Sequence, residues 1–391
     1  MPRQFHSTIE EPEKAYLVGV QRTGARDGWR GESSLDELAL LARTAGAQVV
    51  GTTLQRLDAP NPATYVGKGK VDEIKSRRNT DGYTMVVLDD ELSPSQQTHL
   101  EDAFGVKVLD RTALILDIFA MRARTREGRL QVELAQSEYL LPRLKGQWSH
   151  LERLGGRSGS PGAIGVRGPG ETQIETDRRL VRKKITKLKE EIERVRQQRS
   201  LYRRRRQREG VPVIALVGYT NAGKSTLMRA LTRDSDVFVQ DQLFATLDPL
   251  TRRIYLDDAH PALLTDTVGF IQKLPTQLVA AFRATLEELA DASLLLHVVD
   301  ITHPDAALQS QTVEQTLADL GLSDKPRLTA LNKVDQIADA DGRTPNSLEE
   351  LSAFQGALTA NIPGAVLISA ERRWGLELLK QRLLEELAVH S

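Results

Sequence analysis

The chain has 391 residues, with 53 basic and 53 acidic side chains and no cysteine. This length predicts about two to three domains with a sizeable core, and the lack of cysteine excludes disulfides and thiolate metal sites. The N-terminal residues contain no apolar segment of the signal-peptide kind, and no apolar run approaches the length of a membrane span. We therefore expect a soluble, cytoplasmic protein.

After a flexible tail over residues 1–15, residues 16–125 predict a small α/β domain. Its predicted strands are residues 16–20, 48–54, 85–88 and 106–109, and its predicted helices are residues 35–44, 71–74, 95–104 and 112–121. Strands that alternate with helices are typical of a parallel sheet. Ser33 or Ser34 is available to cap the first helix. Nothing in this domain predicts a catalytic site.

Residues 126–210 predict a long helical hairpin. Apolar residues fall at coiled-coil-like spacing in both halves, which favours two helices packed antiparallel. These residues are Leu130, Leu134 and Leu141 in the first half and Val181, Ile185, Leu188, Ile192 and Val195 in the second. Residues 154–170, between the halves, include seven glycines and two prolines and predict a loop at the tip.

The second half of the hairpin is strongly basic, with fifteen Lys or Arg against three Glu over residues 178–208. An ordinary solvated helix face is the alternative interpretation. We favour RNA binding because this local excess is unfavourable without an anionic partner, and no apolar face is left for a membrane. The expected RNA-binding residues are Arg157, Arg167, Arg178, Arg179, Arg182, Lys183, Lys184, Arg203, Arg204, Arg205 and Arg206.

Residues 211–391 begin with a phosphate-loop pattern. An apolar strand leads into residues 218–225, which read G-x-x-x-x-G-K-S, and a helix follows. The glycines let backbone N–H groups face an anion, and the helix dipole adds positive potential. Lys224 can reach the outer phosphates, while the Ser225 hydroxyl can bind Mg²⁺. A purely structural glycine turn is the alternative, but the flanking strand and helix favour a phosphate site.

Two later segments match the switch regions of a nucleotide-dependent enzyme. We expect Thr246 to bind Mg²⁺, with Thr251 as the alternative, and Asp266 to hold a magnesium water. The Gly269 N–H can contact the terminal phosphate, so loss of that phosphate would release both segments. The expected metal ligands are Ser225 and Thr246, with Asp266 acting through water. The expected catalytic residues are Lys224, Thr246 and Gly269.

The last motifs predict guanine recognition. Asp335 can accept hydrogen bonds from the N1–H and exocyclic amine of guanine, a pair that adenine lacks. Asn332 can join the base to the phosphate loop, the Lys333 stem can cover the ring, and the backbone at Ser369 and Ala370 can donate to guanine O6. The residues expected to bind GTP are Gly218, Tyr219, Thr220, Asn221, Ala222, Gly223, Lys224, Ser225, Thr226, Phe244, Ala245, Thr246, Leu247, Asp248, Asp266, Thr267, Val268, Gly269, Asn332, Lys333, Val334, Asp335, Ser369 and Ala370.

These motifs (GYTNAGKS, FATLD, DTVG, NKVD and SA), with GPGETQIETDRR over residues 168–179, resemble the HflX family of the Obg–HflX superfamily. The resemblance implies an α/β fold with a mostly parallel P-loop GTPase domain, joined by the hairpin to the N-terminal α/β domain. It also implies binding to the large ribosomal subunit near its RNA, and ribosome dissociation. The chain stops soon after the helical pattern at residues 376–389, so we expect it to lack the extra C-terminal domain of some relatives.

The resemblance leaves the attacking water without an obvious partner. Phe270 occupies the place of the glutamine that orients water in Ras-like enzymes. We therefore expect slow hydrolysis that ribosomes stimulate. Gln272 stands at the wrong offset, and Arg252 and Arg253 fit a surface role better than an internal arginine finger. We also hypothesise that Asn221 helps to bind K⁺.

Other functions remain open at this stage. One is a GTP-dependent factor for assembly of the large subunit, and another is an RNA-binding scaffold with a structural nucleotide site. A small-molecule kinase is disfavoured by the guanine-specific pattern at residues 332–335. We expect a monomer, because the hairpin can satisfy its own apolar seam.

Overall fold

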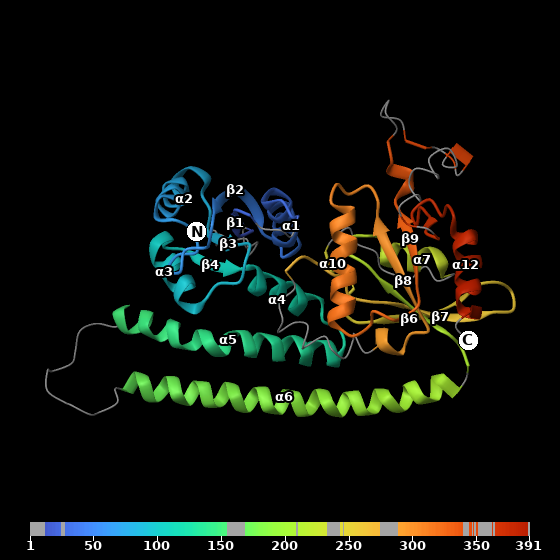
Figure 1. The fold of residues 1–391 in the computed structure, drawn as a ribbon. Coiled ribbons are helices and arrows are strands. Elements are labelled where there is room, and N and C mark those ends of the chain that lie inside the picture. The colour runs from blue at the N-terminus through green and yellow to red at the C-terminus, as the bar shows by residue number, and fades with distance from the viewer. Residues whose placement is uncertain are drawn as a thin grey trace, which may run out of the picture. The chain divides into compact units, whose positions relative to one another are not determined.

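The computed structural model describes residues 12–24, 28–154, 169–208, 210–232, 243–244, 246–273, 288–338, 344–345, 347, 349–350, 362 and 364–389. Side chains at residues 145–154, 169–174 and 200–208 fall outside this description. The chain divides into two compact units, Met1–Ile118 with Leu140–Arg179, and Phe119–Tyr139 with Leu180–Ser391. Both contain parallel sheets with helices (Figure 1), so the expected α/β fold is confirmed.

The first unit contains a four-stranded sheet in the order β2-β1-β3-β4, in which every pairing is parallel. The strands are β1 Lys14–Arg22, β2 Gln48–Leu57, β3 Met85–Leu88 and β4 Lys107–Asp110. The helices are α1 Gly31–Thr44, α2 Lys68–Asp81, α3 Pro94–Phe104 and α4 Arg111–Arg122, whose last residues belong to the second unit. All four residues of β3 are buried, as the apolar run predicts for an inner parallel strand.

The start of α1 differs from the prediction. Its N-cap is Arg30, which makes no side-chain capping bond, so the expectation that Ser33 or Ser34 caps this helix is wrong. The Ser34 hydroxyl instead donates to Asp89 at 2.6 Å, and Arg111 donates to the same carboxylate at 2.8 Å. A buried carboxylate requires such donors, and this need outweighs the weak capping preference of an exposed turn.

The long helical hairpin is confirmed as α5 Arg126–Leu154 and α6 Pro169–Arg208 (Figure 1). Within the second unit, Leu130, Leu134 and Leu188 form a buried seam, flanked by partly buried Ile185 and Ile192. Ion pairs border the seam, between Lys184 and Glu133 and between Lys189 and Glu138, each at 2.8 Å. The predicted loop at the hairpin tip lies outside the described residues between 155 and 168.

The second unit also contains a six-stranded sheet in the order β10-β9-β8-β5-β7-β6, in which β6 alone runs antiparallel to its neighbour. Its elements are β5 Val213–Val217, α7 Lys224–Leu231, β6 Leu250–Tyr255, β7 Pro261–Asp266, β8 Leu294–Asp300, α10 Ala306–Asp319, β9 Arg327–Asn332, the 3₁₀ turn η1 Val334–Gln336, β10 Val366–Leu367 and α12 Leu376–Val389. The carboxyl ends of β5, β7, β8 and β9 share one edge, where open α/β sheets bind ligands.

Among the described helices, none combines the length and the apolar character needed to cross a bilayer.

Candidate functional site

The loop between β5 and α7 has the backbone that its glycines predict. Gly218 and Gly223 have φ angles of +151° and +94°. A Cβ added to Gly218 would lie 2.3 Å from the Val298 carbonyl oxygen, and one added to Gly223 would lie 2.2 Å from Asn332 Nδ2. Both positions therefore require glycine on conformational and steric grounds.

Lys224 lies buried inside this loop. Its Nζ donates to the carbonyl oxygens of Gly218 at 3.0 Å and Tyr219 at 2.8 Å. Burial lowers the pKa of Lys224 to about 8, and the nearby carboxyl group of Asp266 opposes this shift. The loop thus curls around an amine that is held by backbone oxygens and shielded from water.

Three oxygen atoms meet at the start of α7. Asp266 Oδ2 accepts hydrogen bonds from Ser225 Oγ and Thr246 Oγ1, each at 2.7 Å, and the two hydroxyls lie 3.0 Å apart. Burial raises the pKa of Asp266, against the lowering effects of Lys224 and these hydrogen bonds. Its other oxygen, Oδ1, is buried without a hydrogen-bond partner in the described part of the chain.

This oxygen cluster fits Mg²⁺, which binds few protein carboxylates and completes its octahedron with water and phosphate oxygens. The described residues accordingly contain no group of three or more His, Cys, Asp or Glu that could hold a metal by themselves. Thr246 is the threonine that joins the cluster. The alternative, Thr251, instead places its hydroxyl 3.0 Å from that of Thr265 on neighbouring strands.

The segment after β7 lies against the phosphate loop. Phe270 donates its N–H to the Gly218 carbonyl oxygen at 3.1 Å, and its own carbonyl oxygen accepts from the Thr220 N–H at 2.7 Å. Gly269 has no space for a side chain, because an added Cβ would lie 2.8 Å from Thr220 Cγ2 and 3.0 Å from Lys224 Nζ. The Thr267 hydroxyl points to the Leu216 carbonyl oxygen at 2.6 Å, so it supports the strand.

No described side chain clearly takes the place of the missing glutamine. Phe270 is buried, and Gln272 is buried with its Oε1 lacking a partner in the described chain. The Gln272 N–H donates to the Tyr219 hydroxyl at 2.7 Å. On β6, Arg252 donates to the adjacent Thr251 carbonyl oxygen at 3.3 Å, and Arg253 is exposed.

Asn332 at the end of β9 connects the phosphate loop to the last motif. Its Nδ2 donates to the Ala222 carbonyl oxygen at 2.8 Å, and its Oδ1 accepts the Ala370 N–H at 3.0 Å. The next residue, Lys333, has a left-handed backbone with φ of 66°, and its Nζ lies 2.6 Å from Asp300 Oδ2. The Asn332 side chain thus connects the end of β9 with the phosphate loop and with the loop at Ala370.

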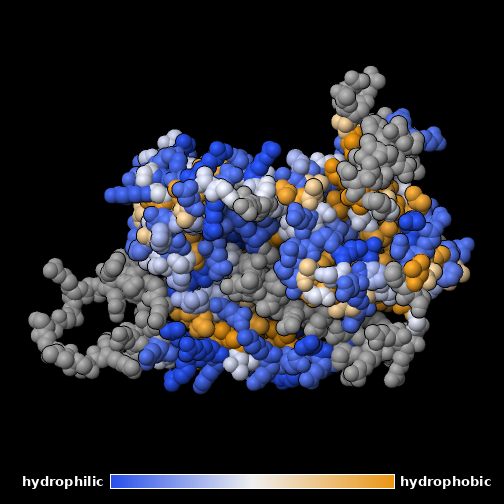
Figure 2. Space-filling model, viewed as in Figure 1, coloured by the Kyte–Doolittle hydropathy of each residue, from blue (hydrophilic) through white to orange (hydrophobic). Residues whose placement is uncertain are grey.

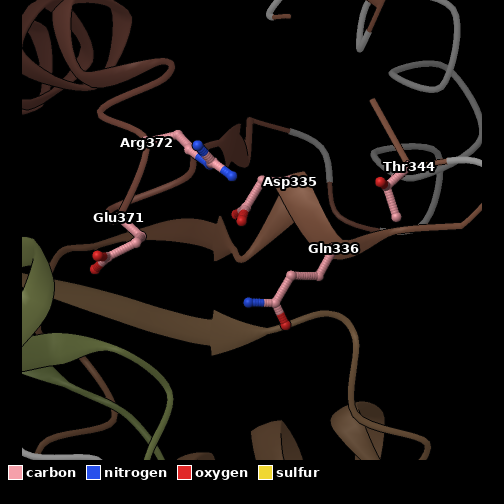
Figure 3. A pocket seen from close by; sticks show the side chains of 5 residues that line it. All are labelled: Asp335, Gln336, Thr344, Glu371 and Arg372. Atoms are coloured by element: carbon pink, nitrogen blue, oxygen red, sulfur yellow. The ribbon is translucent and has the colours of Figure 1, made fainter. Parts of the chain in front are cut away.

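A pocket of about 650 Å³ lies beside these loops, within the size range of ligand pockets. Figure 3 shows its five lining side chains, Asp335, Gln336, Thr344, Glu371 and Arg372. Only Asp335 was predicted. The other four carry no motif of their own, although Gln336, Glu371 and Arg372 directly follow the two guanine motifs.

The backbone donors expected to meet guanine O6 already have partners. Ser369 donates its N–H to the Trp374 carbonyl oxygen at 3.2 Å, and Ala370 donates to Asn332. The Ser369 hydroxyl accepts the Arg372 N–H at 3.0 Å and so closes the turn. The contact expected between this backbone and the base is therefore not preformed.

Two residues of the FATLD segment, Phe244 and Asp248, have side-chain contacts near the start of α5. The Phe244 ring packs edge-to-face on Phe119, with centroids 4.6 Å apart. The Asp248 carboxylate accepts backbone N–H groups from Arg124 and Thr125 at 2.9 and 2.8 Å. Both side chains contact the chain at the end of α4 and the start of α5. Ala245 lies outside the described residues.

The expected RNA-binding residues divide by position. Arg179, Arg182 and Lys183 are exposed on α6, whereas Lys184 pairs with Glu133. Figure 2 shows hydrophilic residues along the outer side of this helix and hydrophobic ones along its seam with α5. Arg178 is half-buried. The residues outside the described set are Arg157 and Arg167, together with the side chains of Arg203, Arg204, Arg205 and Arg206.

A phosphate loop between a parallel strand and a helix, with further motifs at the neighbouring strand ends, defines a P-loop GTPase. Three protein families match the chain along its length. "GTP-binding GTPase N-terminal" matches residues 32–120, "GTP-binding GTPase Middle Region" matches residues 122–206, and "50S ribosome-binding GTPase" matches residues 213–333.

Several curated relatives are named GTPase HflX. GTPase HflX of Caldanaerobacter subterraneus subsp. tengcongensis is 52% identical over 325 residues, which cover 83% of this chain and 73% of the relative. GTPase HflX of Escherichia coli K12 is 43% identical over 376 residues, covering 96% and 83% of the two chains. A GTP-binding protein from Sulfolobus solfataricus, solved in complex with GDP, is 26% identical with a TM-score of 0.47 and covers 97% of this chain and 100% of that one. The chain belongs to the HflX family of GTPases, and it binds and hydrolyses GTP.

Proposed function

We propose that this GTPase acts on the large ribosomal subunit and dissociates ribosomes in the cytoplasm, as a monomer. The observation that supports this proposal best is the basic surface of α6, here meaning Arg179, Arg182, Lys183, Lys187 and Arg194, all of which are exposed. This surface belongs mainly to the same compact unit as the GTPase sheet. A chain with no net charge that concentrates cations on one helix is suited to a polyphosphate partner.

We assign the phosphate end of the site to residues that the structure places together. Bound Mg²⁺ would neutralise negative charge on the transferred phosphoryl group. Ser225 and Thr246 would hold it directly, and Asp266 would orient one of its waters while it fixes both hydroxyls. Lys224 would contact the outer phosphates, and the Gly269 N–H would contact the terminal one.

We assign the base end to Asn332, Lys333 and Asp335. Asp335 would accept from the guanine edge, the Lys333 stem would cover the ring, and Asn332 would hold the base loop to the phosphate loop. The remaining residues of the predicted GTP site would shape its backbone. We also propose that residues 16–125, 126–210 and 211–391 act as three functional parts, which the three family matches support.

We propose that hydrolysis is slow until a ribosome binds. Phe270 is buried and has no polar atom in its side chain, so it cannot orient a water molecule. The attacking water would then be positioned by backbone groups, by a rearranged switch or by the ribosomal partner. Ribosomes would stimulate hydrolysis if they supply or reorder the group that positions the water.

The test is GTP turnover with and without purified large subunits across a salt series. We expect stimulation by orders of magnitude that weakens with salt, because RNA contacts release counterions. The double variant Arg182→Glu with Lys183→Glu should reduce stimulation and flatten the salt slope by about one unit per lost contact. Lys380→Glu with Arg382→Glu, which changes charge equally on α12, should leave both unchanged.

A flat response to large subunits would contradict the ribosomal proposal but not the GTPase activity. The second candidate, an assembly factor, is separated by light scattering of whole ribosomes mixed with protein and GTP. Dissociation predicts a fall in scattering. Binding to large subunits without such a fall would favour assembly. Multiple turnover of GTP excludes a scaffold whose nucleotide is only structural.

We further propose that K⁺ stimulates hydrolysis through Asn221. This residue is exposed on the phosphate loop and has a left-handed backbone with φ of 62°. Its amide oxygen is a suitable ligand for a monovalent cation beside the phosphates. Turnover should be faster in K⁺ than in Na⁺, and Asn221→Gly, which tolerates the same φ, should remove the difference. Equal rates in both salts, with and without ribosomes, would refute this role.

A further inference from the structure

Asp248, two residues after Thr246, contacts the chain just before α5. Its Oδ2 accepts the N–H groups of Arg124 and Thr125 at 2.9 and 2.8 Å, and its Oδ1 accepts the Thr125 hydroxyl proton. The Thr125 hydroxyl in turn accepts the Gly128 N–H at 3.0 Å. Thr125 directly precedes α5 and acts as its N-cap, so Asp248 extends this cap from a distant part of the chain.

The chemistry of this contact favours a carboxylate. The first turn of a helix leaves N–H groups without partners and carries positive potential, which stabilises an adjacent anion. Gly128 lies in that first turn, and a Cβ added there would lie 2.4 Å from Asp248 Oδ1. The absence of a side chain at Gly128 therefore makes room for the carboxylate.

The start of α5 is itself held in place within the second unit. Arg199 of α6 forms an ion pair with Glu127, with Nε 3.0 Å from Oε2, and its Nη1 lies 3.4 Å from Glu288 Oε1. One turn later, Leu130 and Leu134 pack on Leu188. Asp248 thus forms hydrogen bonds to the start of α5. That helix end is also held by α6, through the ion pair of Glu127 with Arg199 and the packing on Leu188.

Thr246 lies only two residues before Asp248, so the two Cα atoms are at most about 7 Å apart. The intervening Leu247 is buried, and the nearby Phe244 packs on Phe119. The contacts of Phe244 and Asp248 lie on either side of Thr246 and oppose its withdrawal from Ser225 and Asp266.

We propose that Asp248 is a positioning residue for GTP hydrolysis: by holding the start of α5, it keeps Thr246 in the magnesium cluster. This inference rests on the proposed role of Thr246 as a magnesium ligand. It makes the base of the hairpin a structural part of the triphosphate site. The contact acts on the GTP-bound state, because a switch threonine is drawn to the metal only when the terminal phosphate is present.

The test measures equilibrium binding of a non-hydrolysable GTP analogue and of GDP at a series of Mg²⁺ concentrations. Asp248→Ala removes the hydrogen bonds to Arg124 and Thr125 directly. Gly128→Ala displaces the Asp248 carboxylate but raises the helix propensity of α5. If Asp248 only stabilised the helix, this variant would therefore not weaken binding of the analogue. The matched controls are Gly69→Ala, at a helical glycine with open space around it, and the exposed Asp258→Asn. Thr246→Ala serves as the reference.

We expect Asp248→Ala and Gly128→Ala each to raise the Mg²⁺ concentration for half-maximal analogue binding by about tenfold, as for a lost helix cap. GDP affinity should match that of the controls, and the double variant should resemble either single one. The thermal midpoint without nucleotide should fall slightly for Asp248→Ala, because the α5 cap loses hydrogen bonds. If Thr246→Ala raises the Mg²⁺ requirement but Asp248→Ala and Gly128→Ala behave like the controls, this inference is wrong, while the proposed magnesium role of Thr246 stands. If Thr246→Ala has no effect, the proposed magnesium role fails as well.

Discussion

Replacing Lys224 with methionine is expected to weaken binding of both GTP and GDP by at least about a hundredfold. Methionine keeps an unbranched apolar side chain but removes the ammonium group that would face the phosphates. Each hydrogen bond to a charged group contributes about 1.5–3 kcal/mol, so losing two of them corresponds to roughly a hundredfold or more in affinity. Equilibrium titration with a fluorescent guanine nucleotide measures this loss.

The same change should leave the nucleotide-free protein folded. Burial lowers the pKa of Lys224 to about 8, because the buried ammonium loses solvation by water. The Gly218 carbonyl oxygen also keeps the Phe270 N–H as a second partner. We therefore expect no fall in the thermal midpoint.

Lys325→Met is the matched control for this prediction. Lys325 is partly buried, burial lowers its pKa, and its Nζ donates to the Ala292 carbonyl oxygen at 2.5 Å, as a structural lysine would. Its replacement should not change nucleotide affinity. Normal GTP binding by Lys224→Met would show that the phosphate-loop assignment is wrong.

The phosphate loop and the sheet that carries it could be predicted because their signals are local. The five residues of β5 are followed directly by glycine, lysine and serine at the spacing that phosphate binding requires. The role of each of these residues depends only on its neighbours within a few positions of the chain. The strand ends at Asp266 and Asn332 follow the same logic, since a buried parallel strand delivers its last polar residue to the ligand edge.

Contacts between distant parts of the chain could not be predicted in this way. Asp248 and Thr125 are separated by 123 residues, and no sequence pattern at either residue indicates that they are in contact. Asp248 is the last residue of the FATLD switch motif, so the sequence predicted a role at GTP. Ser34 shows the same limit, because a buried carboxylate 55 residues away determines its partner.

The pocket at the base end was predicted only through Asp335. Glu371 and Arg372 line it because the turn closed by Ser369 and Trp374 directs them there. Turn geometry of this kind depends on positive φ angles at Arg373 and Gly375, of 60° and 70°. A glycine in the sequence indicates such a turn, but it does not indicate which side chains the turn presents.

Asp335→Asn is expected to reverse base specificity from guanine to xanthine nucleotides. Guanine offers two donors, N1–H and the exocyclic amine, and a carboxylate accepts both. Asparagine offers one acceptor and one donor, which suit the N1–H and the C2 carbonyl of xanthine. The exocyclic amine of guanine would then face another donor, and unpaired polar groups at a half-buried site weaken binding.

We expect the GTP affinity of Asp335→Asn to fall by about a hundredfold or more while the affinity for XTP rises, so that the order of preference is inverted. Competition titrations of GTP and XTP against one fluorescent nucleotide measure both changes. Glu371→Gln is the matched control, because it removes the same charge from the same pocket (Figure 3) and its carboxylate pairs with Arg229 at 3.3 Å. This control should preserve the preference for GTP. If both variants weaken GTP equally and neither gains XTP, the pocket acts through its charge alone and Asp335 does not recognise the base.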